Sequence, residues 1–259
     1  MYFQDISIAA LISIAKNAGN EIMKVYSKDF SVETKNDSSP LTEADKKSNE
    51  VILVELKKMY PEIPFISEEN KLTLYEERKK WKRFWLIDPL DGTKEFIKKN
   101  GEFTVNIALI EEGVPVVGVV YVPAQRKTYY GAKGIGSFKS ENGNAPVEIK
   151  NLQHYSTKDK VVVVGSRSHL SEETLQFVEN LKVSGKEVEF LSSGSSLKFC
   201  LVAEGAADVY PRFGPTMEWD TAAAQAVAVY AGKKVINYET RHSLIYNKEN
   251  LLNPWFIVE

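Results

Sequence analysis

Asp88 and Asp91 are three residues apart in the sequence Asp-Pro-Leu-Asp-Gly-Thr, and their types and spacing suit a metal site. Hard divalent cations such as Mg²⁺ take carboxylate and carbonyl oxygens as ligands, and the carbonyl group of Leu90 stands between the two acids. Gly92 permits backbone shapes that other residues avoid, and the N–H groups of Gly92 and Thr93 at a helix start suit a phosphate. The run therefore predicts a cation and a phosphate bound side by side.

Two other interpretations of this run compete with a metal site. Asp-Pro and Asp-Gly are common turn dipeptides, so the run is also typical of a plain turn. In the phosphatase motif Asp-x-Asp-Gly-Thr the first aspartate is a covalent nucleophile, and the two acids are two residues apart. Here Asp88 and Asp91 are three apart with Pro89 between them, so the covalent interpretation fits poorly. The plain turn stays open on this stretch alone.

The acids follow an apolar run, Phe84 to Ile87, which predicts a short buried strand. Pro89 has no N–H group for a strand ladder, so the strand is expected to stop there. A second predicted strand, residues 64–69, also ends in acids, Glu68 and Glu69. Adjacent acids are typical of a solvated turn, but open α/β sheets bind ligands at strand ends. Two neighbouring strand ends are thus expected to supply carboxylates.

Two further acids lie near predicted helix starts. Asp45 is close to the start of a helix expected over 42–59, where it either closes a capping box with Thr42 or has a function. Asp220 opens an alanine-rich helix that Gly232 closes, and by itself it is most simply an N-cap.

The remaining pattern predicts two parts of different architecture. The first has a helix over 4–26, a short strand over 30–35, a hairpin of 103–111 and 114–122, and strands at 127–130 and 137–139. The second alternates strands at 161–164, 187–191, 207–210, 235–237 and 256–258 with helices at 171–182, 192–203 and 220–231, which indicates α/β structure. The charged segment 71–83 is expected to be a mobile surface excursion. The polar connector 145–160 predicts a boundary between an N-terminal α+β domain, 1–150, carrying most metal ligands, and a C-terminal domain, 151–259, carrying substrate groups and Asp220.

Composition excludes several classes of function. The chain has 259 residues, 43% hydrophobic and 26% charged, with a net charge of −2, so no general field for nucleic acid or membrane is implied. Cys200 is the single cysteine, which excludes a disulfide within the chain and indicates a reducing compartment. No signal peptide and no 18-residue apolar run are visible. A cytoplasmic protein is expected, with a peripheral position on the cytoplasmic side of the inner membrane as a second expectation; monomer and homodimer both stay open.

Three motifs in order resemble the inositol monophosphatase superfamily across essentially the whole chain: Phe-Ile-Ser-Glu-Glu at 65–69, Trp-Leu-Ile-Asp-Pro-Leu-Asp-Gly-Thr at 85–93 and Glu-Trp-Asp-Thr-Ala-Ala at 218–223. The segments 194–205 and 208–216, with Lys-Glu-Phe at 94–96, are similar to its branch of 3'(2'),5'-bisphosphate nucleotidases. One departure is Ala224, where the superfamily usually has glycine. The extra methyl group puts the packing of this helix in doubt, but it does not affect the predicted metal binding by Asp220.

The resemblance implies a layered α/β/α/β/α sandwich of the α+β class. It also implies Mg²⁺-dependent hydrolysis of 3'-phosphoadenosine 5'-phosphate (PAP) to AMP and phosphate by a metal-activated water, with its sulfated form (PAPS) as a further substrate and inhibition by Li⁺. Two or three Mg²⁺ ions are implied, and the ligands carried over are Glu68, Asp88, the Leu90 carbonyl, Asp91 and Asp220. The catalytic residues carried over are Asp45, Glu68 and Thr93, with Asp45 and Thr93 orienting the water. Glu69 is expected to hold a ligand in place.

The substrate-binding residues expected are Leu90, Asp91, Gly92, Thr93, His169, Ser195, Lys198, Arg212 and Asp220. His169 is expected to pack on or hydrogen-bond the nucleotide, with a solvated loop histidine as the alternative. Lys198 and Arg212 are expected to bind a retained 5'-phosphate, with solvated surface positions as the alternative. Two other functions remain: an inositol or sugar phosphatase on the same scaffold, and a nucleotide or metal sensor without turnover. A phosphate-release assay on adenosine bisphosphates, inositol phosphate and fructose bisphosphate distinguishes these functions.

Overall fold

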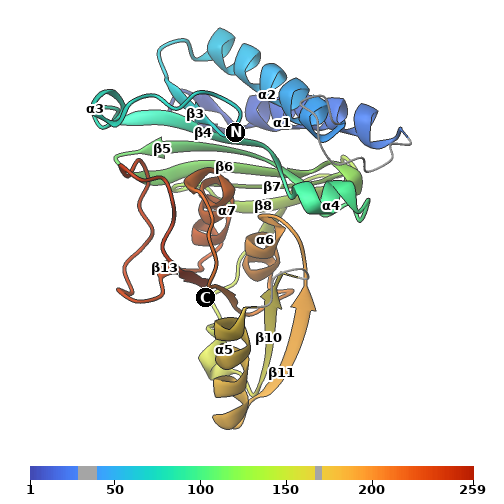
Figure 1. Cartoon of the computed structure of the whole chain (residues 1–259), viewed down its shortest axis with the longest axis vertical. Helices are drawn as coiled ribbons and strands as arrows, with labels where there is room; N and C mark the ends of the chain where they lie inside the picture. Colours follow the sequence, from blue (N-terminus) through green and yellow to red (C-terminus); the bar gives the residue numbers. More distant parts are fainter. Residues whose placement is uncertain (29–39, 167–170) are drawn as a thin grey trace.

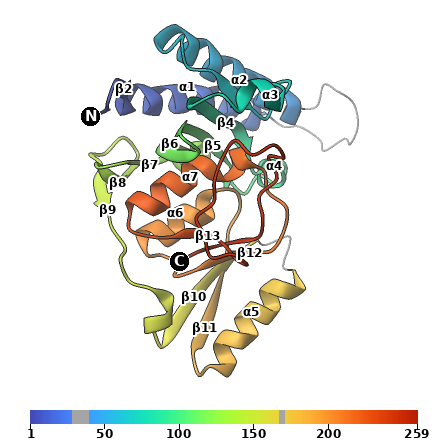
Figure 2. The same cartoon turned by 90° about the vertical axis from the view of Figure 1, so that its left-hand side faces the viewer.

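The elements form five layers in the order helix, sheet, helix, sheet, helix, and the last helix lies beside the smaller strands at one end of the long axis (Figure 1). The structure is a computed structural model that describes residues 1–28, 40–166 and 171–259, without the side chains of residues 40–42. Seen from the side, α5 (Glu172–Val183) lies at the opposite end from α1 (Ile8–Tyr26) and α2 (Pro40–Met59). Between them lie α6 (Leu197–Glu204) and α7 (Glu218–Tyr230) (Figure 2). The layering confirms the expected α+β sandwich. The strand expected over 30–35 lies outside the described residues.

The first layer consists of α1 (Ile8–Tyr26) and α2 (Pro40–Met59), which cover one face of the large sheet. In α1 the buried apolar residues recur every three or four positions, as the sequence predicts. The helix begins later than expected because β1 (Tyr2–Phe3) pairs with β2 (Ile6–Ser7), and the Ser7 hydroxyl oxygen then caps the helix by accepting from Ala10 N. Among the described residues, no helix is both long and apolar enough to cross a bilayer.

The second layer is a seven-stranded sheet in the order β3-β4-β5-β6-β7-β8-β9. Its strands are β3 (Phe65–Ser67), β4 (Arg83–Asp91), β5 (Thr104–Glu111), β6 (Val114–Val122), β7 (Lys127–Ala132), β8 (Gly136–Glu141) and β9 (Val147–Ile149). Within this sheet β3 and β4 are parallel, and all other neighbouring strands are antiparallel. The predicted hairpin at Glu112 and Gly113 is confirmed, and both residues have positive φ, as the tight turn requires.

Both faces of this sheet are buried, which explains the continuous apolar run in β4. Phe84 and Leu86 belong to the core that contains α6 and α7, whereas Trp85 and Ile87 belong to the core under α1 and α2. Asp88 continues the first of these series, so it faces α6 and α7. The end of β4 therefore points polar side chains into the middle of the molecule.

The prediction that β4 stops at Pro89 is wrong. The strand continues to Asp91, because three steps along β4 match two steps along β5: Asp88 lies opposite Asn106 and Asp91 opposite Thr104. This extra residue is a β-bulge, which tolerates a proline that cannot donate to the ladder. Side chains alternate between faces, so without the bulge Asp88 and Asp91 would face opposite sides.

The third layer consists of α6 (Leu197–Glu204) and α7 (Glu218–Tyr230). The small residues of α7 let its backbone lie directly on β6. The sequence suggested that Asp220 is the N-cap of α7. This is wrong, because the helix starts two residues before Asp220. It is the third helical residue, and its Oδ2 accepts a hydrogen bond of 2.8 Å from the N-cap residue Met217 N.

The fourth layer contains β10 (Lys160–Gly165) and β11 (Glu187–Ser192), which are parallel, and an antiparallel trio β12 (Tyr210–Arg212), β14 (Phe256–Val258) and β13 (Val235–Asn237). The expectation of uniform α/β structure is thus only partly right, because β14 inserts between β12 and β13. The fifth layer is α5 (Glu172–Val183), capped by Ser171 as expected. The domain division at residue 150 stays a prediction; α7, from the second part, packs on the sheet of the first.

The charged segment 71–83 is not a loose excursion. It contains α3 (Tyr75–Arg78), and Arg78 is only 1% exposed. Its guanidinium group donates to the Asn247 side chain and to the carbonyls of Lys248 and Glu249. A buried cation is stable only with such partners, so this arginine ties the segment to the C-terminal part of the chain.

Gly118→Ala should lower the free energy of unfolding by about 3 kcal/mol, since a methyl group there overpacks the junction of β6 and α7. Its Cβ would lie 2.1 Å from the carbonyl oxygen of Ala223. Urea denaturation measures the loss. Gly214→Ala is the matched control, because its Cβ meets nothing closer than 3.6 Å. Equal losses in the two variants would contradict the close packing of α7 on the sheet.

Candidate active site

Carboxylates from three elements meet at the end of β4. Glu68 follows β3, Asp88 lies in β4, and Asp220 lies in α7; one oxygen of each lies within 4.8 Å of the others. Asp88 is 1% exposed. Hard divalent cations bind carboxylate oxygens in such clusters, so the donor set fits Mg²⁺.

The electrostatics of the cluster also favour a cation. Burial raises the pKa of Asp88 well above its usual range, and the charges of Asp91 and Glu68 add to this effect. Burial, followed by the charge of Asp91, raises the pKa of Asp220 to about 7. Acids that repel one another in a buried site are stabilised together by a bound cation, which makes the ionised form favourable.

Asp91 lies beside this cluster and faces a different group. Its Oδ2 accepts a hydrogen bond of 2.5 Å from Ser196 N, at the start of α6. Burial raises its pKa, while the positive charge of Lys198 opposes the rise. Within the bulge, Leu90 N donates to Asp88 Oδ1, and the Ser48 hydroxyl of α2 donates to the carbonyl of Pro89 at 2.8 Å. These two contacts hold the backbone of the bulge in place. The predicted role of the Leu90 carbonyl as a metal ligand stays a prediction.

Asp45 lies within reach of the same acids. It is the sixth residue of α2 and 8% exposed, beyond the first turn in which a capping role was considered. The Thr42 side chain is outside the described residues. Burial, followed by the charges of Glu69 and Glu68, raises the pKa of Asp45 to about 8. Asp45 therefore lies close enough to these two glutamates for their charges to act on it.

The turn after β4 has the predicted shape. Gly92 has φ 94°, in the left-handed region that favours glycine. Thr93 then begins α4 (Thr93–Ile97) with an exposed side chain. The predicted role of Thr93 in orienting water stays a prediction.

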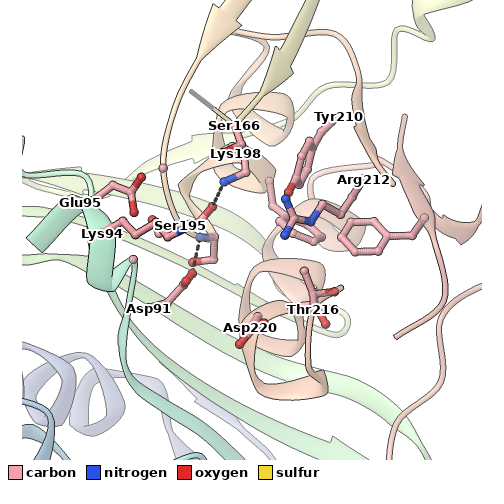
Figure 3. A pocket seen from close by; sticks show the side chains of 16 residues that line it. Asp91, Lys94, Glu95, Ser166, Ser195, Lys198, Tyr210, Arg212, Thr216 and Asp220 are labelled. Carbon is pink, nitrogen blue, oxygen red and sulfur yellow. Dashed lines mark hydrogen bonds between the residues drawn. The ribbon is translucent and has the colours of Figure 1, made fainter. Parts of the chain in front are cut away.

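A cavity extends from the acids towards a second, basic group of side chains (Figure 3). Asp91 and Asp220 lie on one side of it, and Lys198 and Arg212 lie across from them. Six predicted site residues line this one cavity: Asp91, Gly92, Ser195, Lys198, Arg212 and Asp220. His169 lies outside the described residues.

Lys198 and Arg212 are held by backbone carbonyls rather than by acids. Lys198 is 6% exposed and its Nζ donates to Ser195 O at 2.6 Å, which contradicts the alternative of a solvated lysine. Burial lowers its pKa to about 8. Arg212 Nη2 donates to Pro215 O at 3.0 Å, and its buried Nε has no hydrogen-bond partner among the described residues. Both cations retain donors for an anion.

The sequence did not single out the polar group that joins the acids to α6. The Ser196 hydroxyl bonds both Asn106 Oδ1, at 2.8 Å, and Thr104 Oγ1, at 2.9 Å. Asn106 and Thr104 lie in β5 directly opposite Asp88 and Asp91. A signal did exist, because asparagine is unfavourable inside an apolar strand and Val-Asn-Ile-Ala-Leu has one.

Comparison with known proteins agrees with this geometry. The model of the inositol monophosphatase family matches residues 4–255. The chain belongs to the inositol monophosphatase family. Members of this family depend on metal ions, usually Mg²⁺, in accord with the acidic cluster.

Several members of the inositol monophosphatase family resemble the chain over at least 95% of its length. It is 48% identical to "3'(2'),5'-bisphosphate nucleotidase CysQ" of Salmonella typhimurium, over 95% of this chain and 96% of that protein. The protein of the same name in Escherichia coli K12 is 47% identical over the same shares. The crystal structure of CysQ from Bacteroides thetaiotaomicron has a TM-score of 0.89 at 46% identity, covering 100% of this chain and 98% of that one. An inositol monophosphatase from Anabaena has a TM-score of 0.70 at 25% identity, covering 97% and 88%.

The metal-free protein should become less stable as pH rises from about 4 to about 8. Asp45 binds its proton up to a pKa of about 8 when folded but only up to the usual value of 3.8 when unfolded. The folded state therefore holds more protons in this window, and each pH unit costs up to about 1.4 kcal/mol of unfolding free energy for one such group. Urea denaturation in the presence of a chelator, at several pH values, measures the slope.

Asp45→Asn should make this slope shallower, because the amide does not titrate, whereas Asp88 and Asp220 still contribute to it. Glu179→Gln, an exposed acid on α5, serves as the control and should leave the slope as it is. A slope in Asp45→Asn equal to that of the wild type would show that Asp45 does not titrate with the cluster.

Proposed function

We propose that the protein is a Mg²⁺-dependent 3'(2'),5'-bisphosphate nucleotidase. It removes the 3'-phosphate of PAP to give AMP and phosphate, and it accepts PAPS as a further substrate. The observation that carries this proposal is that one cavity has carboxylates at one end and two cations, Lys198 and Arg212, at the other. A substrate with two phosphates matches that charge pattern. The high identity to proteins named 3'(2'),5'-bisphosphate nucleotidase CysQ supports the same activity.

The acidic end would hold two or three Mg²⁺ ions. The residues that hold them are Glu68, Asp88, the Leu90 carbonyl, Asp91 and Asp220. When bound, Mg²⁺ lowers the pKa of the attacking water and neutralises charge on the phosphate and on the leaving oxygen. Asp220 reaches this end from α7, and its Oδ2 is already oriented by Met217 N.

The chain's own groups orient the water and the cleaved phosphate. Asp45 accepts a hydrogen bond from the attacking water, and the Thr93 hydroxyl group binds it from the start of α4. The N–H groups of Gly92 and Thr93 bind phosphate oxygens, because the first N–H groups of a helix lack partners. The reaction is a direct attack by water. Cys200 cannot serve as the nucleophile, because it is fully buried and burial raises the pKa of its thiol.

The basic end selects the substrate, since the acidic end binds only the phosphate that is cleaved. Lys198 neutralises the retained 5'-phosphate as a point charge, and Arg212 contacts it through the Nε–H that has no other partner. The hydroxyl of Ser195 faces the same cavity and binds ribose or phosphate oxygens. An inositol monophosphate has no second phosphate for these groups. Parallel phosphate release from PAP, inositol phosphate and fructose bisphosphate tests the proposal, and preference for either of the latter two would overturn it.

Arg212→Ala should reduce kcat/KM for PAP by about 10- to 100-fold, because a charge-assisted contact contributes about 1.5–3 kcal/mol. Hydrolysis of 3'-AMP, which has no 5'-phosphate, should barely change. Measuring both substrates with both enzymes isolates the contact. Arg241→Ala, an exposed arginine paired with Glu259, is the control and should change neither rate. Equal losses of Arg212→Ala on both substrates would show that Arg212 acts only on the structure.

Asp91→Asn should reduce turnover of PAP by about two orders of magnitude or more, because metal ions contribute several kcal/mol to the transition state. The asparagine oxygen can still accept from Ser196 N, so the fold survives. The metal-free variant should be at least as stable as the wild type, since one repelling charge is gone. Turnover at limiting Mg²⁺ and thermal unfolding in chelator measure the two effects. Asp159→Asn, an exposed acid, is the control; near-normal turnover of Asp91→Asn would reject the metal assignment.

A further inference from the structure

An amide group without a full set of partners lies in the sheet beside the acids. Asn106 is 1% exposed, in the middle of β5. Its Oδ1 accepts a hydrogen bond from the Ser196 hydroxyl, but its buried Nδ2 has no hydrogen-bond partner among the described residues. Buried donors in native proteins are almost always satisfied, and an unsatisfied one is destabilising. Such a donor indicates a state of the protein in which the partner is in place.

The sheet register identifies the acceptor. Asn106 lies directly opposite Asp88, and residues opposite each other in adjacent antiparallel strands point to the same face with their Cβ atoms about 4.5–5.5 Å apart. An asparagine amide spans that separation. Asp88 is equally buried, and the only hydrogen bond it accepts from the described backbone is that from Leu90 N to Oδ1. The carboxylate of Asp88 is therefore the acceptor nearest in register to the free amide.

The other end of Asn106 reaches the basic side of the cavity through Ser196. The Ser196 hydroxyl bonds Asn106 and Thr104, and Ser196 N donates to Asp91 Oδ2. Ser195 and Ser196 immediately precede α6, which carries Lys198. One chain of hydrogen bonds thus runs from the loop before α6, through Ser196, to Asn106 opposite Asp88. We call Asn106, Ser196 and Thr104 the polar relay.

We propose that Asn106 is a positioning residue that orients Asp88 for the cation and links that carboxylate to the loop before α6. Its free amide N–H donates to the carboxylate of Asp88 in the cation-loaded protein, while its oxygen keeps Ser196 in the place from which Ser196 N holds Asp91. Hydrogen bonds to ligating carboxylates fix their orientation, and removing them commonly weakens metal binding 10- to 100-fold. This inference rests on the proposed Mg²⁺ site. It adds a residue that does not touch the substrate or the ion.

Asn106→Leu tests the amide, because leucine has almost the same shape and no hydrogen-bonding atoms. Mg²⁺ affinity is measured without substrate, by calorimetry and by the rise in melting temperature during a Mg²⁺ titration. The dissociation constant should increase by about 10- to 100-fold. The melting temperature in chelator should change little, because the substitution also removes the unsatisfied donor. A merely structural residue would show the reverse pattern, with lower stability and unchanged affinity.

Ser196→Ala tests the polar relay independently, and it replaces Asn106→Leu as the test if that variant does not fold. It removes the hydroxyl and keeps the backbone N–H that donates to Asp91. Mg²⁺ binding should weaken here too, and the double variant should be no weaker than Asn106→Leu alone, because residues that act as a unit are not additive. Ser137→Ala is the matched control: this serine is also buried in the sheet, and its hydroxyl donates to Val227 O at 2.7 Å, away from the acids. It should lower the melting temperature without changing Mg²⁺ affinity.

Mg²⁺ affinities of Asn106→Leu and Ser196→Ala within about twofold of the wild type would overturn the proposal. The same measurements separate it from the proposed function. If the wild type binds Mg²⁺ but releases no phosphate from PAP, the nucleotidase activity is rejected. The Mg²⁺ affinities of the two variants then still decide whether the polar relay positions Asp88. A wild type that does not bind Mg²⁺ would reject both.

Discussion

Mutual repulsion between closely spaced carboxylates is the constraint on which the rest of the structure depends. Asp88 and Asp220 are held close to Glu68 in a place where burial already disfavours their charges. Holding the acids together costs free energy, which the scaffold must supply and which protonation or a bound cation lowers. The scaffold does so from three directions: the bulged end of β4, the strand end of β3 and the first turn of α7. Each element is anchored in one of the two large cores, so the energy that holds the acids together comes from apolar packing elsewhere.

The same cavity joins two opposite electrostatic environments. The acids gather at one end. At the other end Lys198 donates to the carbonyls of Ser193 and Ser195, and among the described residues it forms no ion pair with an acid. Ser196 N lies between the two ends and donates to Asp91. A substrate with one phosphate at each end, as proposed above, would relieve both imbalances at once. Under this proposal, the basic end of the cavity would distinguish substrates that differ only beyond the cleaved group.

Local features of the site were predictable from the sequence, and features that depend on distant partners were not. Asp88, Asp91 and the turn at Gly92 were visible because type and spacing are local properties. The continuation of β4 through Pro89 was not, since the bulge depends on the register with β5. Arg78 was missed for the same reason: its partners lie about 170 residues further along the chain. The sequence suggested Asp220 as the N-cap, but the N-cap is Met217, three residues earlier, because neighbouring positions at a helix start favour the same residue types.

The position of α7 has a consequence for the order in which the site is built during synthesis. This helix lies late in the chain but packs on a sheet made from residues before 150, and it brings Asp220 to acids that were translated more than 100 residues earlier. Contacts between such distant segments form slowly, because closing a long loop costs entropy before packing repays it. A nascent chain therefore lacks one wall of its cation site until α7 has left the ribosome. At the proposed site, a cation would stabilise only the finished topology, so its binding would act on the late steps of folding rather than on the early ones.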